Sequence, residues 1–172
     1  YYSDNIFEKV IEGFRKLQTL VFHGDVLFND PKYGSYLRKP YKLNNFKTMP
    51  LNHPTMFIRK EVYDLVGLFD TSYRYSMDFE FYCRLYNCYP DLSNRHYYFD
   101  TNPIVVMSAG GESWANEIKS ILEVKRSVKK NGLTSFSLNV QLQLRLFRTY
   151  LKSILDKTGL TFLVRFWRKS IH

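Results

Sequence analysis

Residues 52–70 read NHPTMFIRKEVYDLVGLFD, and this stretch combines two short elements with a clear end signal. The apolar run at 55–58 predicts a short strand. The segment 60–66 then predicts a short helix. Gly67 is expected to end that helix, because glycine adopts the left-handed backbone of a helix C-terminus without a steric cost.

The next stretch, residues 76–88, reads SMDFEFYCRLYNC and predicts a longer helix at 77–88. Ser76 is expected to cap its N-terminus, since a serine oxygen can accept a hydrogen bond from a free backbone N–H group. Glu80 and Arg84 lie four positions apart, a spacing that allows an ion pair on the helix surface. Pro90 is incompatible with further helix.

The remaining chain alternates strand-like and helix-like patterns, which predicts an α/β fold. A polar break at His23-Gly24-Asp25 is expected to interrupt the first long strand. The expected strands are 19–28, 35–41 (paired back as a hairpin), 95–99 and 103–107, and the other expected helices are 4–17, 113–130, 135–155 and 160–169.

Composition allows several classes of partner. The chain has 172 residues, enough for one domain with a core, and a net charge of +9. Residues 111–172 hold 12 Lys and Arg against 4 Asp and Glu, a balance of +8. This basic part suits nucleic acid, anionic lipid or a phosphorylated substrate, or is simply solvated helix surface. No run of about 18 apolar residues is present, so the sequence predicts no membrane-spanning helix.

Three pieces of sequence have a familiar order and spacing. The first piece runs from His53 to Gly67-Leu68-Phe69-Asp70. The second is Asp-Phe-Glu-Phe, which starts at Asp78 and is followed by Arg84. The third is Gly110-Gly111 followed by Glu-Ser. Together with His23-Gly24-Asp25, they resemble the acceptor-side motifs of family 2 glycosyltransferases, which have the GT-A fold. The resemblance extends over about residues 21–113.

The resemblance implies a partial GT-A-type mixed sheet with flanking helices at 1–113, followed by a basic helical extension at 114–172. It implies transfer of a sugar from a nucleotide-sugar to a hydroxyl of a polysaccharide or lipid-linked glycan. In the family, the strands that bind the nucleotide and the Asp pair that binds the metal lie before the position of Tyr2. We therefore expect a Mn or Mg ion to be bound by ligands that this chain lacks, and we expect the chain alone to be inactive.

Asp78 is the expected catalytic residue, because the resemblance aligns it with the base that accepts a proton from the acceptor hydroxyl. Its place near a helix N-terminus also favours an ionised carboxylate. The alternative is a first-turn Asp without chemistry.

The expected substrate-binding residues each have a structural alternative as well. Glu80 is either a second acceptor-site carboxylate or the partner of Arg84, which would brace the carboxylates. His53 either faces the site or lies in an ordinary loop. Gly110 and Gly111 form either a hinge near the ligand or a plain turn, and Trp114 is a candidate for stacking on a sugar ring. No metal-binding residue is expected in the chain.

Two other functions remain open from the residues alone. The aromatic content of 17% suits a non-catalytic glycan-binding module. The basic C-terminal part suits a membrane-surface or nucleic-acid-binding module, although no nucleic-acid motif is present and nucleic acid is not an expected partner. The mixture of aromatic and basic residues at 160–169 is typical of an interfacial helix. The expected location is the cytoplasm, with peripheral attachment at the inner face of the plasma membrane.

Overall fold

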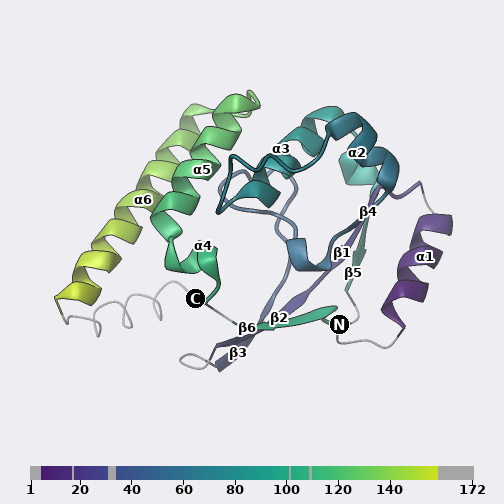
Figure 1. Ribbon diagram of the computed structural model, residues 1–172, viewed down its shortest axis with the longest axis horizontal. Helices are drawn as coiled ribbons and strands as arrows, with labels where there is room; N and C mark the ends of the chain where they lie inside the picture. Colours follow the sequence, from purple (N-terminus) through teal and green to yellow (C-terminus); the bar gives the residue numbers. More distant parts are fainter. Residues whose placement is uncertain (1–4, 17, 31–33, 101, 109, 159–172) are drawn as a thin grey trace.

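The computed structural model describes residues 5–16, 18–30, 34–100, 102–108 and 110–158 (Figure 1). These residues form a mixed α/β structure in which helices and short strands alternate. In chain order, the elements are α1 (Ile6–Lys16), β1 (Val21–Gly24), β2 (Val26–Asp30), β3 (Gly34–Arg38), a 3₁₀ turn (His53–Thr55), β4 (Phe57–Ile58), α2 (Lys60–Val66), α3 (Met77–Cys88), a second 3₁₀ turn (Leu92–Asn94), β5 (His96–Phe99), β6 (Val105–Ser108), α4 (Glu112–Ala115), α5 (Glu117–Lys130) and α6 (Phe136–Lys157).

The strands form two small mixed sheets with the orders β4-β1-β5 and β3-β2-β6. In each sheet the central strand has one antiparallel and one parallel neighbour. Only Asp25 separates β1 from β2, so the chain passes directly from one sheet to the other. The backbone N–H of Ile104 donates to the carbonyl oxygen of Asp25 at 2.9 Å and links the two parallel ladders across this break.

Gly24 allows the two sheets to approach at this junction. A Cβ atom at Gly24 would lie 2.4 Å from Cδ1 of Ile104 and 2.8 Å from the carbonyl oxygen of Phe99. No side chain fits within those distances, so the close approach of Phe99 and Ile104 requires glycine at this position.

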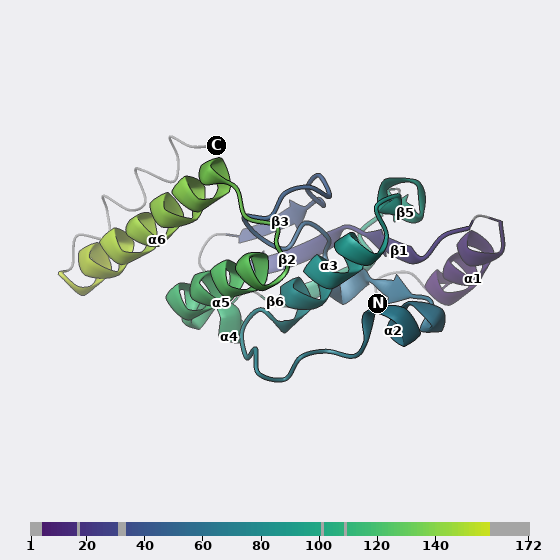
Figure 2. The same cartoon turned by 90° about the horizontal axis from the view of Figure 1, so that it is seen from above.

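Helices cover the first sheet and extend to one side of it. Ile6 and Val10 of α1 pack with Phe22 of β1 in a small buried cluster. A larger cluster joins α2 and α3 to the end of α5 and the start of α6, with Phe79, Val128 and Leu142 among its members. Figures 1 and 2 show α5 and α6 side by side, with α6 on the outer edge of the molecule.

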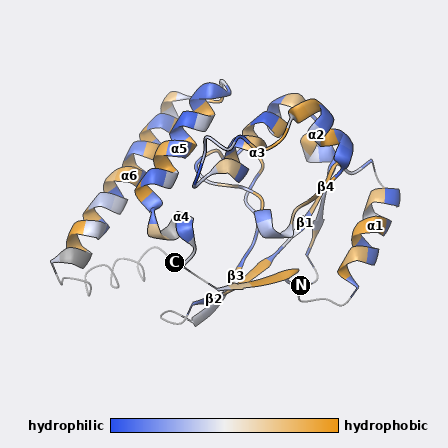
Figure 3. Ribbon diagram, viewed as in Figure 1, coloured by the Kyte–Doolittle hydropathy of each residue, from blue (hydrophilic) through white to orange (hydrophobic). Residues whose placement is uncertain are grey.

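Apolar residues lie on the central strands and on the helix faces that pack against the core. Figure 3 shows them along β2 and β6, whereas α5 and α6 alternate between apolar and polar residues. Because Val124, Val128, Leu138 and Leu142 lie in the same core cluster as α3, the helices after residue 113 pack against the part before it.

Several sequence-based expectations are confirmed. The helices at 60–66 and 77–88 have the predicted bounds, and Gly67 ends the first with a φ of 83°. The first strand is interrupted at the predicted polar break, and β3 returns along β2 as a hairpin.

Other expectations are wrong in detail. Of the strand expected at 55–58, only Phe57–Ile58 is strand, because Thr55 belongs to a 3₁₀ turn. The helix expected at 113–130 is divided at Asn116 into α4 and α5. The helix expected at 160–169 lies outside the described residues.

Two stacked histidines connect β1 with β5. His23 is buried, and its Nε2 lies 2.9 Å from Nδ1 of His96, so one ring donates to the other. The ring of His23 also stacks on Tyr98. Burial, together with the nearby ring of His96, lowers the pKa of His23 to about 3, and burial also lowers the pKa of His96.

This pair should make the fold sensitive to mild acid. Between about pH 6.5 and 3 the unfolded chain protonates His23 but the folded chain does not, so stability is lost as the pH falls. We expect the free energy of unfolding to fall by about 2 kcal/mol between pH 7 and 5 from His23 alone, with a further contribution from His96 in the same direction. Urea unfolding at a series of pH values measures this loss.

Two variants identify the source of the pH dependence. His23→Phe keeps an aromatic ring in the stack and should reduce the loss of stability between pH 7 and 5 by about 2 kcal/mol, leaving only the contribution of His96. His53→Phe changes an exposed histidine and should keep the wild-type slope. An unchanged slope in His23→Phe would contradict this assignment.

Candidate functional site

A cavity of about 530 Å³ lies between the β3-β2-β6 sheet, the start of α3 and the helices α4 to α6. Four of the residues singled out from the sequence line it, namely His53, Asp78, Gly110 and Gly111. They come from three separate parts of the chain, and the fold brings them to one cavity.

Asp78 lies in the first turn of α3 and is half-buried. Its Oδ1 accepts a hydrogen bond of 2.8 Å from the backbone N–H of Phe79. The free N–H groups and the dipole at a helix N-terminus stabilise a negative charge at this place. The side chain of Phe79 is buried in the core and fixes the rotation of the helix, so the carboxylate of Asp78 stays at the cavity.

The segment directly before Asp78 is held by α5. The carboxylate of Glu123 accepts three backbone N–H bonds, from Arg74 at 2.9 Å, Tyr75 at 2.7 Å and Ser76 at 2.8 Å. A carboxylate suits this task because each of its oxygens can accept more than one bond. Glu123 therefore fixes the approach of the chain to the N-terminus of α3.

Ser76 occupies the N-cap position of α3, but its side chain does not cap the helix. Its hydroxyl instead contacts Ser120 of α5, at 2.9 Å from the hydroxyl and 3.1 Å from the carbonyl oxygen. The expected cap is wrong because Ser76 is buried against α5, where Ser120 offers a partner and Glu123 already binds its N–H group.

His53 begins a 3₁₀ turn at the cavity and is exposed. The buried residues on both sides of it fix the turn. Asn52 donates to the carbonyl oxygens of Gly24 and Arg38, both at 2.9 Å, and the hydroxyl of Thr55 accepts a bond from the N–H of Gly24 at 3.0 Å. The turn that carries His53 is thus attached to the junction between the two sheets.

Gly110 and Gly111 border the cavity after β6. Gly110 has a φ of 102°, a backbone conformation that favours glycine, and a Cβ on either residue would meet open space. Gly111 directly precedes α4, and Glu112 also lines the cavity. Trp114 lies in α4, and its side chain lies outside the described part of the structure.

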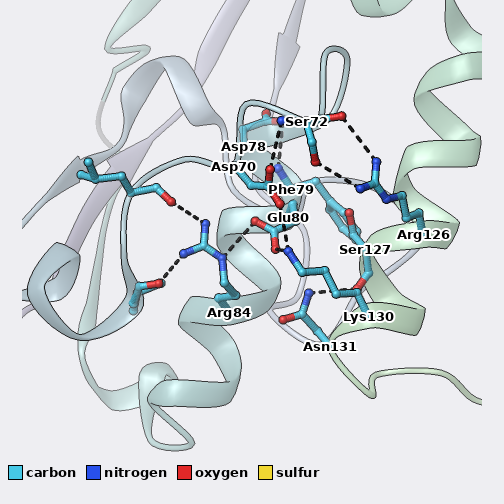
Figure 4. A network of polar contacts seen from close by, with 12 residues as sticks. Asp70, Ser72, Asp78, Phe79, Glu80, Arg84, Arg126, Ser127, Lys130 and Asn131 are labelled. Atoms are coloured by element: carbon cyan, nitrogen blue, oxygen red, sulfur yellow. Dashed lines mark hydrogen bonds and ion pairs between the residues drawn. The ribbon is translucent and has the colours of Figure 1, made fainter.

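Glu80 and Arg84 do not line the cavity. They form the expected ion pair, with Nε of Arg84 3.0 Å from Oε2 of Glu80, but the pair is not on the surface, because Glu80 is fully buried. Lys130 of α5 binds the other carboxylate oxygen at 2.9 Å (Figure 4). Arg84 therefore braces Glu80 but has no bond to Asp78 among its described contacts.

The same network includes the loop after α2. Arg84 also donates to the carbonyl oxygens of Val66 and Leu68, and Lys130 binds Asp70 at 2.9 Å. Hydrogen bonds from Lys130 and Ser72 hold the pKa of Asp70 well below its usual range, while Glu80 and Asp70 raise the pKa of Lys130.

Several charged residues at the cavity were not predicted from the sequence. Arg38, Glu117, Arg145 and Lys152 line it together with Asp78. Arg38 and Arg145 donate to the carbonyl oxygens of residues 49 and 47, at 2.9 and 2.6 Å, and Lys152 lies 3.8 Å from Glu117. Burial lowers the pKa of Arg145, although Glu117 and Tyr41 act in the opposite direction. For Arg145 and Lys152, the only local signal in the sequence was their helical spacing, which places both on one side of α6.

The described residues contain no group of three or more His, Cys, Asp or Glu side chains placed to hold a metal ion. The cavity carboxylates Asp78, Glu112 and Glu117 are therefore not arranged as a ligand set. Within the described ranges, no helix has the length and apolar character needed to cross a membrane.

No family model matches the chain, and no curated protein or solved structure matches it either. The inference of function therefore depends on the cavity and on the sequence motifs that surround it.

The buried carboxylate of Glu80 makes Arg84 important for stability. We expect Arg84→Met to lower the free energy of unfolding by about 3 kcal/mol, because it leaves a buried charge without one of its donors. Arg95 provides a matched control, since it pairs with Asp91 at the same spacing but in solvent. Arg95→Met should cost less than about 1 kcal/mol in the same urea titration. Equal losses in the two variants would contradict the importance of burial.

Glu123 offers a second test of how the site is held. Glu123→Gln removes the charge and one acceptor oxygen from three backbone N–H groups, so we expect a loss of about 2 kcal/mol. Amide hydrogen exchange at residues 74–76 should also become faster. The control Glu117→Gln changes a carboxylate on the same helix whose ion pair is partly exposed, and it should leave exchange at 74–76 unchanged.

Proposed function

We propose that this chain forms the acceptor side of a glycosyltransferase that transfers a sugar from a nucleotide-sugar to a hydroxyl of a polysaccharide or lipid-linked glycan. The observation that carries the proposal is the meeting of Asp78, His53, Gly110 and Gly111 at one cavity of about 530 Å³. This volume lies within the range of about 300–1,000 Å³ that is usual for small-molecule sites. The motifs that resemble family 2 enzymes supply the reaction class.

In the proposed reaction, Asp78 accepts the proton of the acceptor hydroxyl. The oxygen attacks the anomeric carbon of the donor sugar, and the bond from that carbon to the diphosphate breaks as the new glycosidic bond forms. Asp78 is half-buried in the first turn of α3, where the helix dipole stabilises the negative charge that a general base needs. Glu123 acts indirectly by fixing the segment before Asp78.

The other cavity residues suit a polar and partly anionic substrate. Arg38, Arg145 and Lys152 add positive charge to the cavity wall. His53 is exposed and lines the cavity, where its ring nitrogens can bind a sugar hydroxyl. The contacts of Glu80 and Arg84 support a structural role for both residues.

The proposal places the donor half outside this chain. Nucleotide-binding strands would come from residues that precede Tyr1 in a longer polypeptide, and the Mn or Mg ion would be bound there, since the described residues offer no ligand cluster. The chain alone would then be inactive. The location that we propose for this reaction is the cytoplasm.

The test uses the longer polypeptide of this proposal, in which the proposed donor half is joined to this chain. With a nucleotide-sugar and a glycan acceptor, Asp78→Asn should lower kcat at least about 100-fold, because the base is lost, while the affinity for the donor persists. Asp64→Asn changes an exposed carboxylate on α2 and should retain wild-type turnover.

Two outcomes would change the proposal. Wild-type turnover in Asp78→Asn would remove Asp78 from the mechanism. Glycan binding at the cavity without transfer of any nucleotide-sugar by the longer polypeptide would favour the non-catalytic glycan-binding module.

A further inference from the structure

Helix α6 is apolar on two opposite faces. One face packs into the core through Leu138, Leu142 and Leu146. The other, here named the outer face, consists of residues whose exposed fractions range from 40% to 87%. They are Phe136, Val140, Leu144, Phe147, Tyr150, Leu151 and Ile154. Surface helices of soluble domains normally have a single apolar stripe, so a second one indicates that something covers it.

The outer face is a continuous strip. From Val140 to Ile154 the apolar residues follow at intervals of four, three, four and three positions, which keeps them on one side of a helix. The strip from Phe136 to Ile154 is about 27 Å long at the rise of an α-helix. Figures 1 and 2 both show α6 beside α5 at the outer edge of the molecule. Single exposed apolar residues are ordinary, but a strip of this length is typical of a docking surface.

Charge indicates what kind of partner fits. Residues 136–172 contain seven Lys and Arg against one acidic residue, Asp156. An anionic surface would attract these side chains, and an apolar strip beside basic residues is the composition of helices that lie in a membrane interface.

We propose that the outer face of α6 docks on a bilayer surface that contains anionic phospholipids. The helix would lie in the plane of the interface, with Phe147, Leu151 and Ile154 inserted at the boundary of the acyl chains. Arg145 and Lys152 lie on a different side of the helix, where they line the cavity, so docking leaves the cavity accessible. The proposal does not depend on the reaction proposed above.

Vesicle flotation of the full chain tests this proposal. The chain should float with vesicles of phosphatidylcholine and phosphatidylglycerol and bind them at least tenfold more tightly than vesicles of phosphatidylcholine alone. The double variant Phe147→Ser/Ile154→Ser should bind the anionic vesicles at least tenfold more weakly.

The control variant Leu65→Ser/Leu68→Ser removes two apolar side chains of 62% and 76% exposure near α2 and should bind like the wild type. Circular dichroism shows whether each variant is folded. If Phe147→Ser/Ile154→Ser does not fold, Leu144→Ser/Leu151→Ser provides the same test on the same face.

Three results would overturn the proposal. The first is absence of wild-type binding to anionic vesicles. The second is unchanged binding in the outer-face variant, which would assign binding to other residues. The third is a dimer in sedimentation that the outer-face variant converts to a monomer, which would mean that a second copy of the chain covers the face.

Discussion

The buried carboxylate of Glu80 is the constraint on which the arrangement of helices depends. A carboxylate without solvent is stable only where donors neutralise it, and Arg84 and Lys130 supply those donors from α3 and α5. The same two side chains bind the backbone after α2 and the carboxylate of Asp70. One buried charge therefore requires α2, α3, α5 and the loop between the first two to meet at a single point.

The position of the candidate base follows from this arrangement. Helix α5 makes polar contacts with α3 and with the residues before it. Lys130 binds Glu80, and Glu123 binds the segment before Asp78. Glu123 and Lys130 are seven positions apart, so they lie on the same face of α5 two turns from each other. Between them, Ser127 is buried in the same interface. Asp78 is therefore held at the cavity by the contacts of residues on both sides of it, namely Ser76 with Glu123 and Glu80 with Lys130.

The sequence predicted the local elements better than the contacts between them. The helices at 60–66 and 77–88 have strong local signals, an apolar periodicity and a terminal Gly67, and the structure has them at the predicted bounds. The division at Asn116 had no glycine or proline to indicate it.

The candidate site shows the same limit. Glu80 was expected at the surface because a charged residue with a partner four positions away usually lies there. Its burial depends on Lys130, fifty positions further along the chain. Glu123 carries no local pattern that indicates its three backbone partners. The meeting of His53, Asp78 and Gly110 was expected only from the family resemblance.

The contacts of α5 have a consequence for how such a chain can be recombined. The segment after Gly111 looks separable by composition, because it is basic and helical. Yet exchanging it for the corresponding segment of another protein would remove one of the two neutralising partners of a buried acid, together with the acceptor of three backbone amides. A chimera joined at Gly110-Gly111 should keep this fold only if the new helix has an acidic and a basic residue at the positions of Glu123 and Lys130, two turns apart. The change in composition after Gly111 therefore does not mark a boundary between independently packed parts of the structure.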